Sequence, residues 1–346
     1  MISSQYCDGL EIDMLAIGDA DCILVTRWES GLVTRVLIDG GDAGTVDSVC
    51  AFLIGLGVSH IDHVICSHPH DDHAAGLVLL LKDQRFTFGR LWMHQPWCHI
   101  DLSLVARAWA EGKAQKVTKA LAKSLQTQVD LAKTASTRQI PFDVEPFSGQ
   151  TIGPLFVCGP SPQFYDALVL EFSNLNVLVR YESELEQMER EQLLEDVLEK
   201  VGAPQEPSGL LDDPRTEPEN DSATVLWAKY ADKTFVFTSD AGVAALERAK
   251  EDYQIGGCHW MQIPHHGSRR NITKSLIEYF SPKIAYVSAE GNKKHPRRAV
   301  INAFKENGCI VYSTHYPTST NMWLCRGNVP SRQGYNALTP LWEAQS

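Results

Sequence analysis

The chain has 346 residues, of which 44% are hydrophobic and 21% are charged, a composition typical of a globular protein. No run approaches the about 20 apolar residues of a membrane-spanning helix, and the N-terminal residues show no secretory signal. Nine scattered cysteines without a CxxC pair argue against a disulfide framework and favour reduced, buried thiols in a cytoplasmic protein.

The net charge of −12 is unevenly distributed along the chain. Residues 181–221 hold fourteen Asp or Glu against three Lys or Arg, whereas residues 265–298 hold eight Lys or Arg against two Glu. Runs of charge are ordinarily solvated faces. The basic segment therefore gains a functional meaning only if it lies beside chemically active residues.

Hydrophobic periodicity predicts mostly strands in the first part of the chain. In chain order, we expect strands at 10–18, 22–26 and 34–41, a helix at 45–57, a strand at 60–68, helical structure over 101–140, strands and turns over 142–160 and a strand at 175–181. An acidic helix at 182–200 and a segment rich in Pro and Gly at 202–219 follow.

The second part of the chain alternates strands with helices. We expect strands at 222–230 and 233–240, a helix at 242–252, a strand leading into a loop at 260–268, a helix at 272–280, a strand at 283–290, a helix at 296–307 and a strand at 309–315. This succession predicts two packed sheets with helices outside them. We expect one domain over residues 1–346, with insertions at 101–140 and 182–219.

The strongest chemical signal is the run His68-Pro69-His70-Asp71-Asp72-His73, directly after an apolar strand. In an extended or turning backbone, His68 and His70 can point to one side while Asp72 and His73 point to another. Imidazole and carboxylate groups placed in this way can bind two ions a few Å apart, such as zinc, manganese or iron.

This HxHxDH run is the signature of the metallo-β-lactamase superfamily, which the sequence resembles over roughly residues 10–316. The resemblance implies a four-layer αββα sandwich with helical insertions and a hydrolase that uses two divalent metal ions, Zn or Mn. Asp39 looks like the residue that orients the metal-binding loop, and Asp240 like the carboxylate that bridges both metals. Residues 264–268, Pro-His-His-Gly-Ser, look like the last metal-binding motif.

The resemblance leaves two ligand questions open. On the family's Gly-His-Gly pattern the ligand is His266 and His265 supports it or donates a proton, although the two could exchange roles. The family's third-motif histidine is absent, and Asn220-Asp221 stands in its place. The isolated His94 and His99 are expected to be packed or surface residues. The expected ligands are His68, His70 and Asp240, with Asp221 as a further candidate, for one metal, and Asp72, His73, Asp240 and His266 for the other.

Several segments resemble one branch of the superfamily, the ComEC/Rec2-like hydrolases. They are Asn220-Asp221, TSD at 238–240, PHHGS at 264–268, Gly291-Asn292 and His295-Pro296. That branch includes the hydrolase domain of DNA-uptake channel proteins and a phosphorylcholine esterase. The chain shows no membrane segments, so we do not expect a transport role.

Catalytic and substrate-binding candidates surround the expected ligands. Asp72 is expected to orient the attacking water, and His265 and His295 to protonate a leaving group or hold phosphate. A rim of polar and basic side chains suits a polyanionic substrate. The expected substrate-binding residues are Ser268, Arg269, Arg270, Asn292, Lys293, Lys294 and Arg297.

The leading hypothesis is therefore a phosphodiesterase or nuclease that acts on nucleic acid or another phosphodiester, without a membrane partner. An alternative is a hydrolase of small esters, lactones or phosphocholine-type substrates, because one fold hosts many activities. A third hypothesis is a partner subunit that keeps the fold without turnover. The acidic or helical insertions are candidate surfaces for a protein partner.

Overall fold

The computed structural model describes residues 8–99, 125–169, 171–172, 209–289, 295–314, 320–325 and 341. Most of the expected insertion at 182–219 lies outside the described residues, as do the expected strand at 175–181, residues 101–124 and the expected substrate residues Asn292, Lys293 and Lys294. Among the helices that the structure describes, none has both the length and the apolar character needed to cross a membrane.

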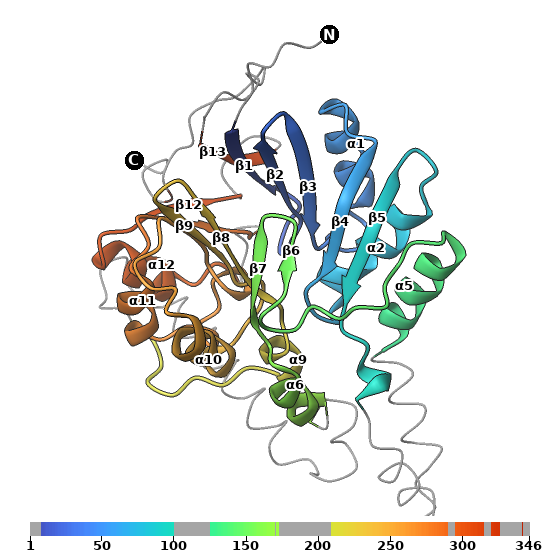
Figure 1. Cartoon of the computed structure of the whole chain (residues 1–346). Helices are drawn as coiled ribbons and strands as arrows, with labels where there is room; N and C mark the ends of the chain where they lie inside the picture. The colour runs from blue at the N-terminus through green and yellow to red at the C-terminus, as the bar shows by residue number, and fades with distance from the viewer. Residues whose placement is uncertain are drawn as a thin grey trace, which may run out of the picture.

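The first sheet contains six strands in the order β13-β1-β2-β3-β4-β5 (Figure 1). Their bounds are β1 (Asp8–Leu15), β2 (Ile23–Glu29), β3 (Leu32–Ile38), β4 (His60–Cys66), β5 (Thr87–Met93) and β13 (Thr320–Cys325). Strands β13, β1, β2 and β3 pair antiparallel, whereas β3, β4 and β5 are parallel. Parallel neighbours need crossover connections, and helices α1 (Val46–Gly55) and α2 (Asp71–Lys82) lie in the two crossovers.

The second sheet contains seven strands in the order β12-β11-β10-β9-β8-β7-β6. Their bounds are β6 (Thr151–Ile152), β7 (Leu155–Gly159), β8 (Val225–Tyr230), β9 (Lys233–Phe237), β10 (Trp260–Gln262), β11 (Ile284–Val287) and β12 (Ile310–Ser313). Strands β9 to β12 are parallel, and β6 to β9 form an antiparallel meander. The carboxyl ends of the parallel strands in each sheet carry the loops described below.

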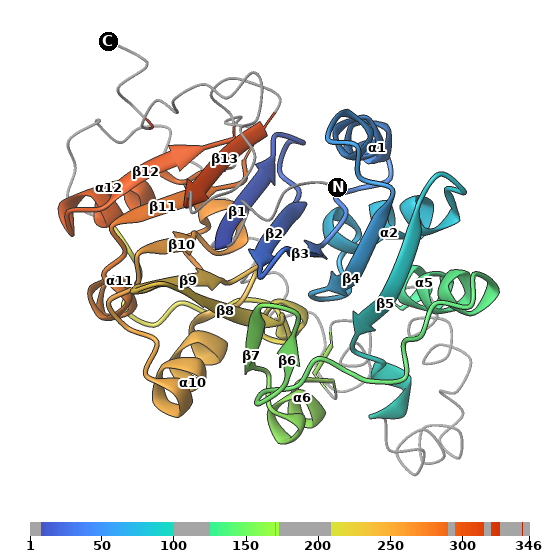
Figure 2. The ribbon, with the colours of Figure 1, turned by 45° about the horizontal axis from the view of Figure 1, so that its top comes forward.

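Helices cover the outer faces of both sheets, as Figure 2 shows. Helices α1, α2 and α5 (Gln126–Thr137) lie beside the first sheet, and α10 (Val243–Tyr253), α11 (Lys274–Phe280) and α12 (Arg298–Glu306) lie beside the second. Shorter helical segments are η1 (Pro96–Cys98), α6 (Pro162–Val169), α9 (Pro218–Asp221) and η2 (His265–Gly267). The four layers, with helices outside two packed sheets, confirm the expected fold class.

Apolar side chains fill all three spaces between these layers. Ile12 and Val25 of the first sheet pack with Leu226 and Trp260 of the second, and all four are buried. Two further clusters lie between the sheets and the outer helices, one beside each sheet. Leu131 of α5 belongs to the cluster beside the first sheet, so residues 126–137 of the expected 101–140 insertion are part of the helical layer.

The motif run itself begins a helix, which the sequence pattern did not predict. Helix α2 starts at Asp71, and its acidic first turn suits the positive end of the helix dipole. Gly76 lies so close to the loop after β3 that a Cβ there would stand 1.9 Å from the Gly40 oxygen. Gly40 donates to the His73 oxygen and Gly76 to the Gly41 oxygen, each at 2.9 Å. These contacts hold the motif against the end of β3.

Candidate metal centre

Metal-capable side chains from both sheets meet at the carboxyl ends of the parallel strands. His68, His70, Asp72 and His73 follow β4, Asp240 follows β9, and His265-His266 follow β10. The backbone turns sharply at these positions, because His265 and His266 have φ of 45° and 52°. Non-glycine residues rarely adopt such angles, and they gather at functional sites where the surrounding structure imposes them.

Two groups of these side chains share Asp240. In the first group, His68, His70 and Asp240 each offer one atom, and these atoms lie within 4.8 Å of one another; we call this the first-ion place. The nearest of these ring nitrogens, His68 Nε2 and His70 Nδ1, are 3.2 Å apart. The Nε2 atom of His68 is 3.8 Å from Asp240 Oδ2.

The second group contains Asp72, His73, Asp240 and His266, again within 4.8 Å of one another, and we call it the second-ion place. His73 Nε2 is 3.4 Å from Asp240 Oδ1, and His266 Nε2 is 3.4 Å from Asp72 Oδ2. The two oxygens of Asp240 therefore face different groups. Asp240 could therefore contribute an oxygen to each ion place.

The histidines are held through the ring nitrogen that points away from the cluster. His68 Nδ1 is 3.0 Å from Ser67 Oγ, His73 Nδ1 is 2.9 Å from Asp39 Oδ2, and His266 Nδ1 is 2.9 Å from the Ser288 oxygen. An acceptor on one nitrogen places the proton there and leaves the lone pair of the other nitrogen for a metal.

The interior of the cluster fits cations. Both carboxylate oxygens of Asp240 and the Nε2 atom of His73 are buried without a hydrogen-bond partner among the described residues. A buried polar group without a partner is costly, so such atoms indicate an unseen ligand. Histidine nitrogens and carboxylate oxygens are ligands that zinc and manganese accept. The residues present therefore fit two divalent ions.

The charges of the cluster are strongly coupled. Burial raises the pKa of Asp240, but the neighbouring histidines outweigh it and hold that pKa well below its ordinary value. Burial lowers the pKa of His266, but Asp240 and Asp72 outweigh it and raise the pKa to about 9. Burial and the charge of His73 lower the pKa of His68. A metal ion that binds His266 would therefore have to displace a proton from its ring.

Asp39 lies where a loop-orienting carboxylate was expected. It is fully buried and accepts hydrogen bonds from the backbone N–H of Ser67 at 2.8 Å and from Ser67 Oγ at 2.6 Å, besides its contact with His73. Sequence reasoning missed a second buried acid, Asp21, whose Oδ2 accepts from Gln262 Nε2 at 2.8 Å and lies 3.9 Å from His73 Nδ1. Burial raises the pKa of Asp21 to about 6.

Sequence reasoning also missed Glu217. Its Oε2 lies 3.4 Å from Nε2 of His70, the ring nitrogen that points away from His68. A carboxylate on the outer nitrogen fixes the ring and makes the inner nitrogen a better ligand. The only available signal was position, since Glu217 stands three residues before Asn220. Glu219 joins His70 and Glu217 in another group of metal-capable side chains.

Asp221, the candidate extra ligand, is placed elsewhere. Its Oδ1 lies beside Gly242 at the start of α10, so close that a Cβ on Gly242 would stand 2.3 Å from it, and burial raises the pKa of Asp221 to about 6. It belongs to none of the groups of metal-capable side chains found among the described residues. The neighbouring Asn220 does approach the centre, because its Nδ2 is 3.3 Å from His265 Nδ1.

The two other expected catalytic histidines lie together beside the cluster. His265 Nε2 is 3.6 Å from Asp240 Oδ2, and burial lowers the pKa of His265. His295 is buried, and its ring stacks on that of His265 with centroids 5.6 Å apart. Asp72 is 37% exposed, so it reaches the opening of the centre.

The expected substrate-binding residues divide into two kinds. Ser268 and Arg297 are buried, and the backbone N–H of Arg297 donates to the Gly267 oxygen, so Arg297 supports the loop. Arg269 and Arg270 are half-buried beside the histidine pair, and the Arg269 guanidinium also donates to the Gly209 oxygen.

His94 and His99 lie outside both ion places. His94 is buried and stacks on Tyr165 with centroids 4.4 Å apart, and burial lowers its pKa to about 3. His99 lies between Asp166 and Glu145, with 2.6 Å contacts to both carboxylates. Both are packed side chains, as their isolation in the sequence led us to expect.

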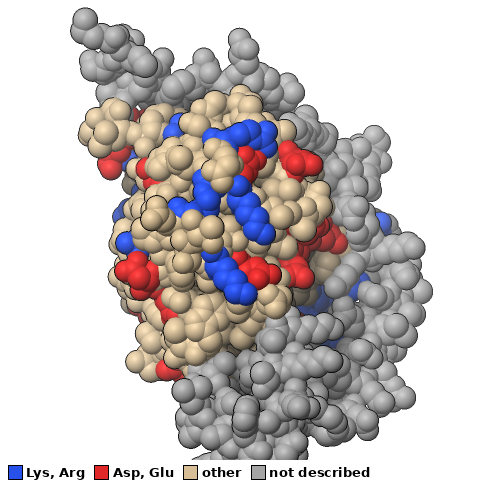
Figure 3. Space-filling model, turned by 90° about the vertical axis from the view of Figure 1, so that its right-hand side faces the viewer, with Lys and Arg blue, Asp and Glu red and all other residues tan. Residues whose placement is uncertain are grey.

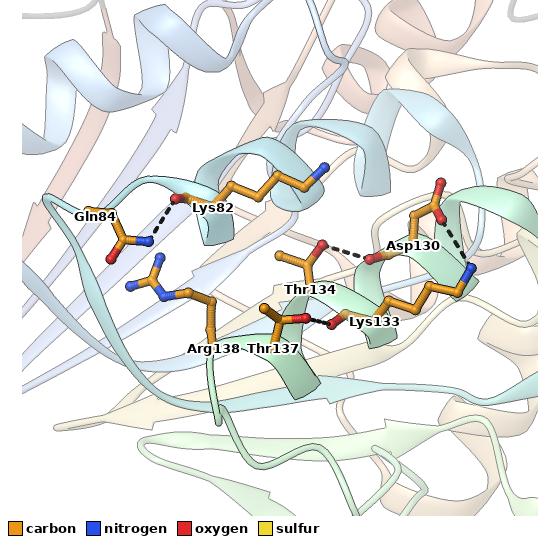
Figure 4. Close-up of a pocket in the computed structure, with 7 residues that line it drawn as sticks. All are labelled: Lys82, Gln84, Asp130, Lys133, Thr134, Thr137 and Arg138. Carbon is orange, nitrogen blue, oxygen red and sulfur yellow. Dashed lines mark hydrogen bonds and ion pairs between the residues drawn. The ribbon is translucent and has the colours of Figure 1, made fainter.

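A separate hollow of about 410 Å³ lies between the end of α2 and α5 (Figure 4). Lys82, Lys133 and Arg138 are among the residues that line it. Figure 3 shows the side of the molecule that lies on the right in Figure 1, where Lys and Arg side chains are interspersed with acidic ones. Arg138 donates to the backbone oxygens of Leu81 and Phe86, so its guanidinium caps the C-terminal end of α2. This hollow shares no residue with the metal-capable cluster.

Comparison with known proteins agrees with the architecture. Residues 21–98, which include Asp39 and the HxHxDH run, match the family model described as the metallo-beta-lactamase superfamily. This match and the two sheets with outer helices give the chain the metallo-β-lactamase fold. Among curated protein sequences, none matches the chain significantly.

Several solved structures are similar to the chain at low identity. The metallo-beta-lactamase fold protein YhfI from Bacillus subtilis is 11% identical with a TM-score of 0.44, and the match covers 92% of this chain and 100% of YhfI. Tm1679, described as a metal-dependent hydrolase of the beta-lactamase superfamily, is 12% identical with a TM-score of 0.44 and coverages of 91% and 98%. CmlA beta-hydroxylase, as its E377D mutant, is 14% identical with a TM-score of 0.40; the match covers 91% of this chain but only 53% of CmlA.

Proposed function

We propose that this chain is a hydrolase that activates water between two divalent metal ions and cleaves phosphodiesters, nucleic acid among them. The observation that carries the proposal is the pair of ion places that share Asp240, with both oxygens of this buried carboxylate lacking a hydrogen-bond partner among the described residues. The fold by itself does not choose a substrate, so the proposal rests on this centre and the charges around it.

Each ligand has a defined task in the proposed reaction. Two bound ions, Zn or Mn, would lower the pKa of a water molecule and stabilise the charge that develops on the phosphoryl oxygens. Asp240 faces both places and would help to hold both ions. Asp72 is 37% exposed, so an oxygen of its carboxylate that does not bind an ion could orient the attacking water. Asp39 holds His73 in the required tautomer.

His295 is the proposed proton donor to the leaving group. Its ring stacks on His265 and makes an edge contact with His266, with centroids 5.9 Å apart, so it borders the centre. Histidine exchanges protons near neutral pH, which suits a general acid. His265 lies nearer Asp240, and its task is treated below.

The substrate class follows from charge beside the centre. Arg269 and Arg270 directly follow the loop that carries the histidine pair, and guanidinium groups bind phosphate oxygens well. The resemblance to the ComEC/Rec2-like branch further supports a nucleic acid. If phosphates are bound electrostatically, the affinity for an oligonucleotide should fall steeply as salt rises.

The experiment is hydrolysis of bis(p-nitrophenyl) phosphate by metal-free protein refilled with Zn²⁺ or Mn²⁺. We expect metal-dependent turnover that the Asp240→Ala variant loses. The control Asp130→Ala, at a residue of the separate hollow whose side chain is 45% exposed, should keep it. Labelled DNA and RNA then identify the polymer.

Other results would point elsewhere. Two bound ions without turnover of any phosphodiester would contradict the proposed substrate class and favour a small ester or lactone, or a partner subunit without turnover. A protein that binds neither metal would contradict the proposed hydrolysis altogether.

A further inference from the structure

The first-ion place has a fourth metal-capable side chain at its edge. His265 Nε2 is 3.6 Å from Asp240 Oδ2, the same carboxylate oxygen that His68 Nε2 faces at 3.8 Å. His266, the adjacent residue, faces the other place through Asp72 and Asp240 Oδ1. The two neighbouring rings therefore point to different oxygens of one bridging carboxylate.

Hydrogen bonds determine which nitrogen of His265 carries the proton. Its Nδ1 is 2.9 Å from Asn271 Oδ1. The orientation of the Asn271 amide is fixed because its Nδ2 donates to the backbone oxygen of Asp240 at 2.8 Å, and that oxygen can only accept. Asn271 Oδ1 must then accept from Nδ1–H of His265. Asn220 Nδ2 also lies 3.3 Å from His265 Nδ1, but it donates to Thr216 Oγ1 at 2.8 Å, and two donors facing each other make no hydrogen bond when Nδ1 carries its proton.

This tautomer leaves a lone pair on His265 Nε2, and that lone pair faces a carboxylate. A lone pair and a carboxylate oxygen 3.6 Å apart make no hydrogen bond and repel each other unless a cation lies between them. The same tautomer cannot donate a proton from Nε2 to a leaving group. The geometry thus favours a ligand over a proton donor.

The backbone supports this division of the pair. His265 and His266 both have positive φ, which turns consecutive side chains in directions that an ordinary strand or helix would not give. His266 is anchored by the backbone oxygen of Ser288 after β11, whereas His265 is anchored by Asn271 before α11. Two separate anchors hold the two rings in place.

We propose that His265 is the third histidine of the first-ion place and takes the part of the absent third-motif histidine, so that His265 and His266 bind different ions. This inference rests on the two-ion centre of the proposed function. His265 is not a member of the His68, His70 and Asp240 group, and it approaches the first-ion place through Asp240 Oδ2 at 3.6 Å.

The test counts and locates ions without measuring activity. Metal-free protein is titrated with Co²⁺ and with Zn²⁺, and bound metal is measured by elemental analysis after dialysis. We expect two ions per wild-type chain. The His265→Ala variant should keep one ion with wild-type affinity and bind the other at least about 10-fold more weakly, since even partners of ligands cost 10- to 100-fold. His266→Ala is the matched variant for the other ion.

A cysteine at the same position gives a direct signature. His265→Cys should show a thiolate-to-cobalt charge-transfer band in the near ultraviolet with Co²⁺, because thiolate is a good ligand for such ions. His265→Ser, of the same size, should show none. No described cysteine belongs to the groups of metal-capable side chains, so the wild-type protein should also lack the band.

The results separate this inference from the proposed function. Two ions bound with wild-type affinity by a folded His265→Ala, together with no band in His265→Cys, would overturn the inference and leave the two-ion hydrolase standing. A wild-type chain that binds fewer than two ions would overturn both.

Discussion

The two ion places differ in how their histidines are enclosed. In the second-ion place, the side chains of His73 and His266 are 0% and 3% exposed, and the exposed ligand is Asp72 at 37%. In the first-ion place, His68 is 0% exposed, but His70 is 31% exposed and its partner Glu217 is 49% exposed. Enclosed histidines keep a fixed position more readily than an exposed one, which water can reach. We expect the second place to retain its ion and the first to exchange it.

The anchors behind the two places explain this difference. His73 is held by buried Asp39 and His266 by a backbone oxygen, both fixed by the sheets. His70 depends on Glu217, which directly precedes the short helix α9 and lies on a different segment of the chain. The second place is therefore part of the sandwich core, and the first depends on a surface segment.

Removing one ligand from each place should weaken the two ions separately. His266→Ala should lower the affinity for the ion of the second place, and His70→Ala should lower the affinity for the ion of the first. Each loss should exceed the about 10- to 100-fold that is typical when the partner of a ligand is removed. In wild-type protein supplied with one equivalent of Co²⁺, the ion should occupy the second place. Isothermal titration and cobalt spectra of the two variants measure this order.

The comparison would fail if His70→Ala lost the tightly bound ion and His266→Ala kept it. Circular dichroism of both variants is the control for folding, since His266 is buried and its loss leaves a gap.

Removing the charge of Glu217 should have a smaller effect on the affinity for the first ion. Glu217→Gln removes the charge from the outer nitrogen of His70 and should weaken the first ion by about 10-fold, within the range for partners of ligands. The affinity for the second ion should stay the same, because Glu217 shares no group of metal-capable side chains with Asp72 or His266 among the described residues. Equal weakening of both ions in a metal titration would show that Glu217 acts on the whole centre.

The smallest effect concerns Asp221, which the structure places outside both groups. Its pKa is raised to about 6 by burial, so the folded chain holds this proton more tightly than an unfolded chain with the ordinary value of 3.8. The stability contributed by this proton is present below pH 3.8 and is lost as the pH rises to about 6. At pH 8 the buried carboxylate then costs on the order of 1–3 kcal/mol.

Asp221→Asn should therefore unfold at a higher temperature than the wild type at pH 8 and at nearly the same temperature at pH 4. Thermal denaturation at the two pH values measures this difference. Metal binding should be unchanged, and a loss of the first ion in this variant would instead restore Asp221 as a ligand.

Elements with a clear local pattern could be predicted from the amino-acid sequence. Apolar periodicity located strands β1 to β4 and helix α1, and the spacing from His68 to His73 predicted metal chemistry because four candidate ligands lie within six residues. It also placed Asp39 and Asp240, since each ends a strand at a turn. Helix α2 was not predicted, because its first turn consists of residues that also belong to the metal-binding motif.

The distant residues that complete the centre could not be predicted, because they meet only when the chain is folded. Glu217 and Asn271 are ordinary polar residues in the sequence, and they gain a task only because α9 and the loop before α11 bring them to His70 and His265. Asp221 looked like a ligand by position, yet its side chain meets the start of α10 instead. The physical reason is that sequence spacing fixes the direction of side chains along one segment, whereas distances between segments depend on how the two sheets and their helices pack.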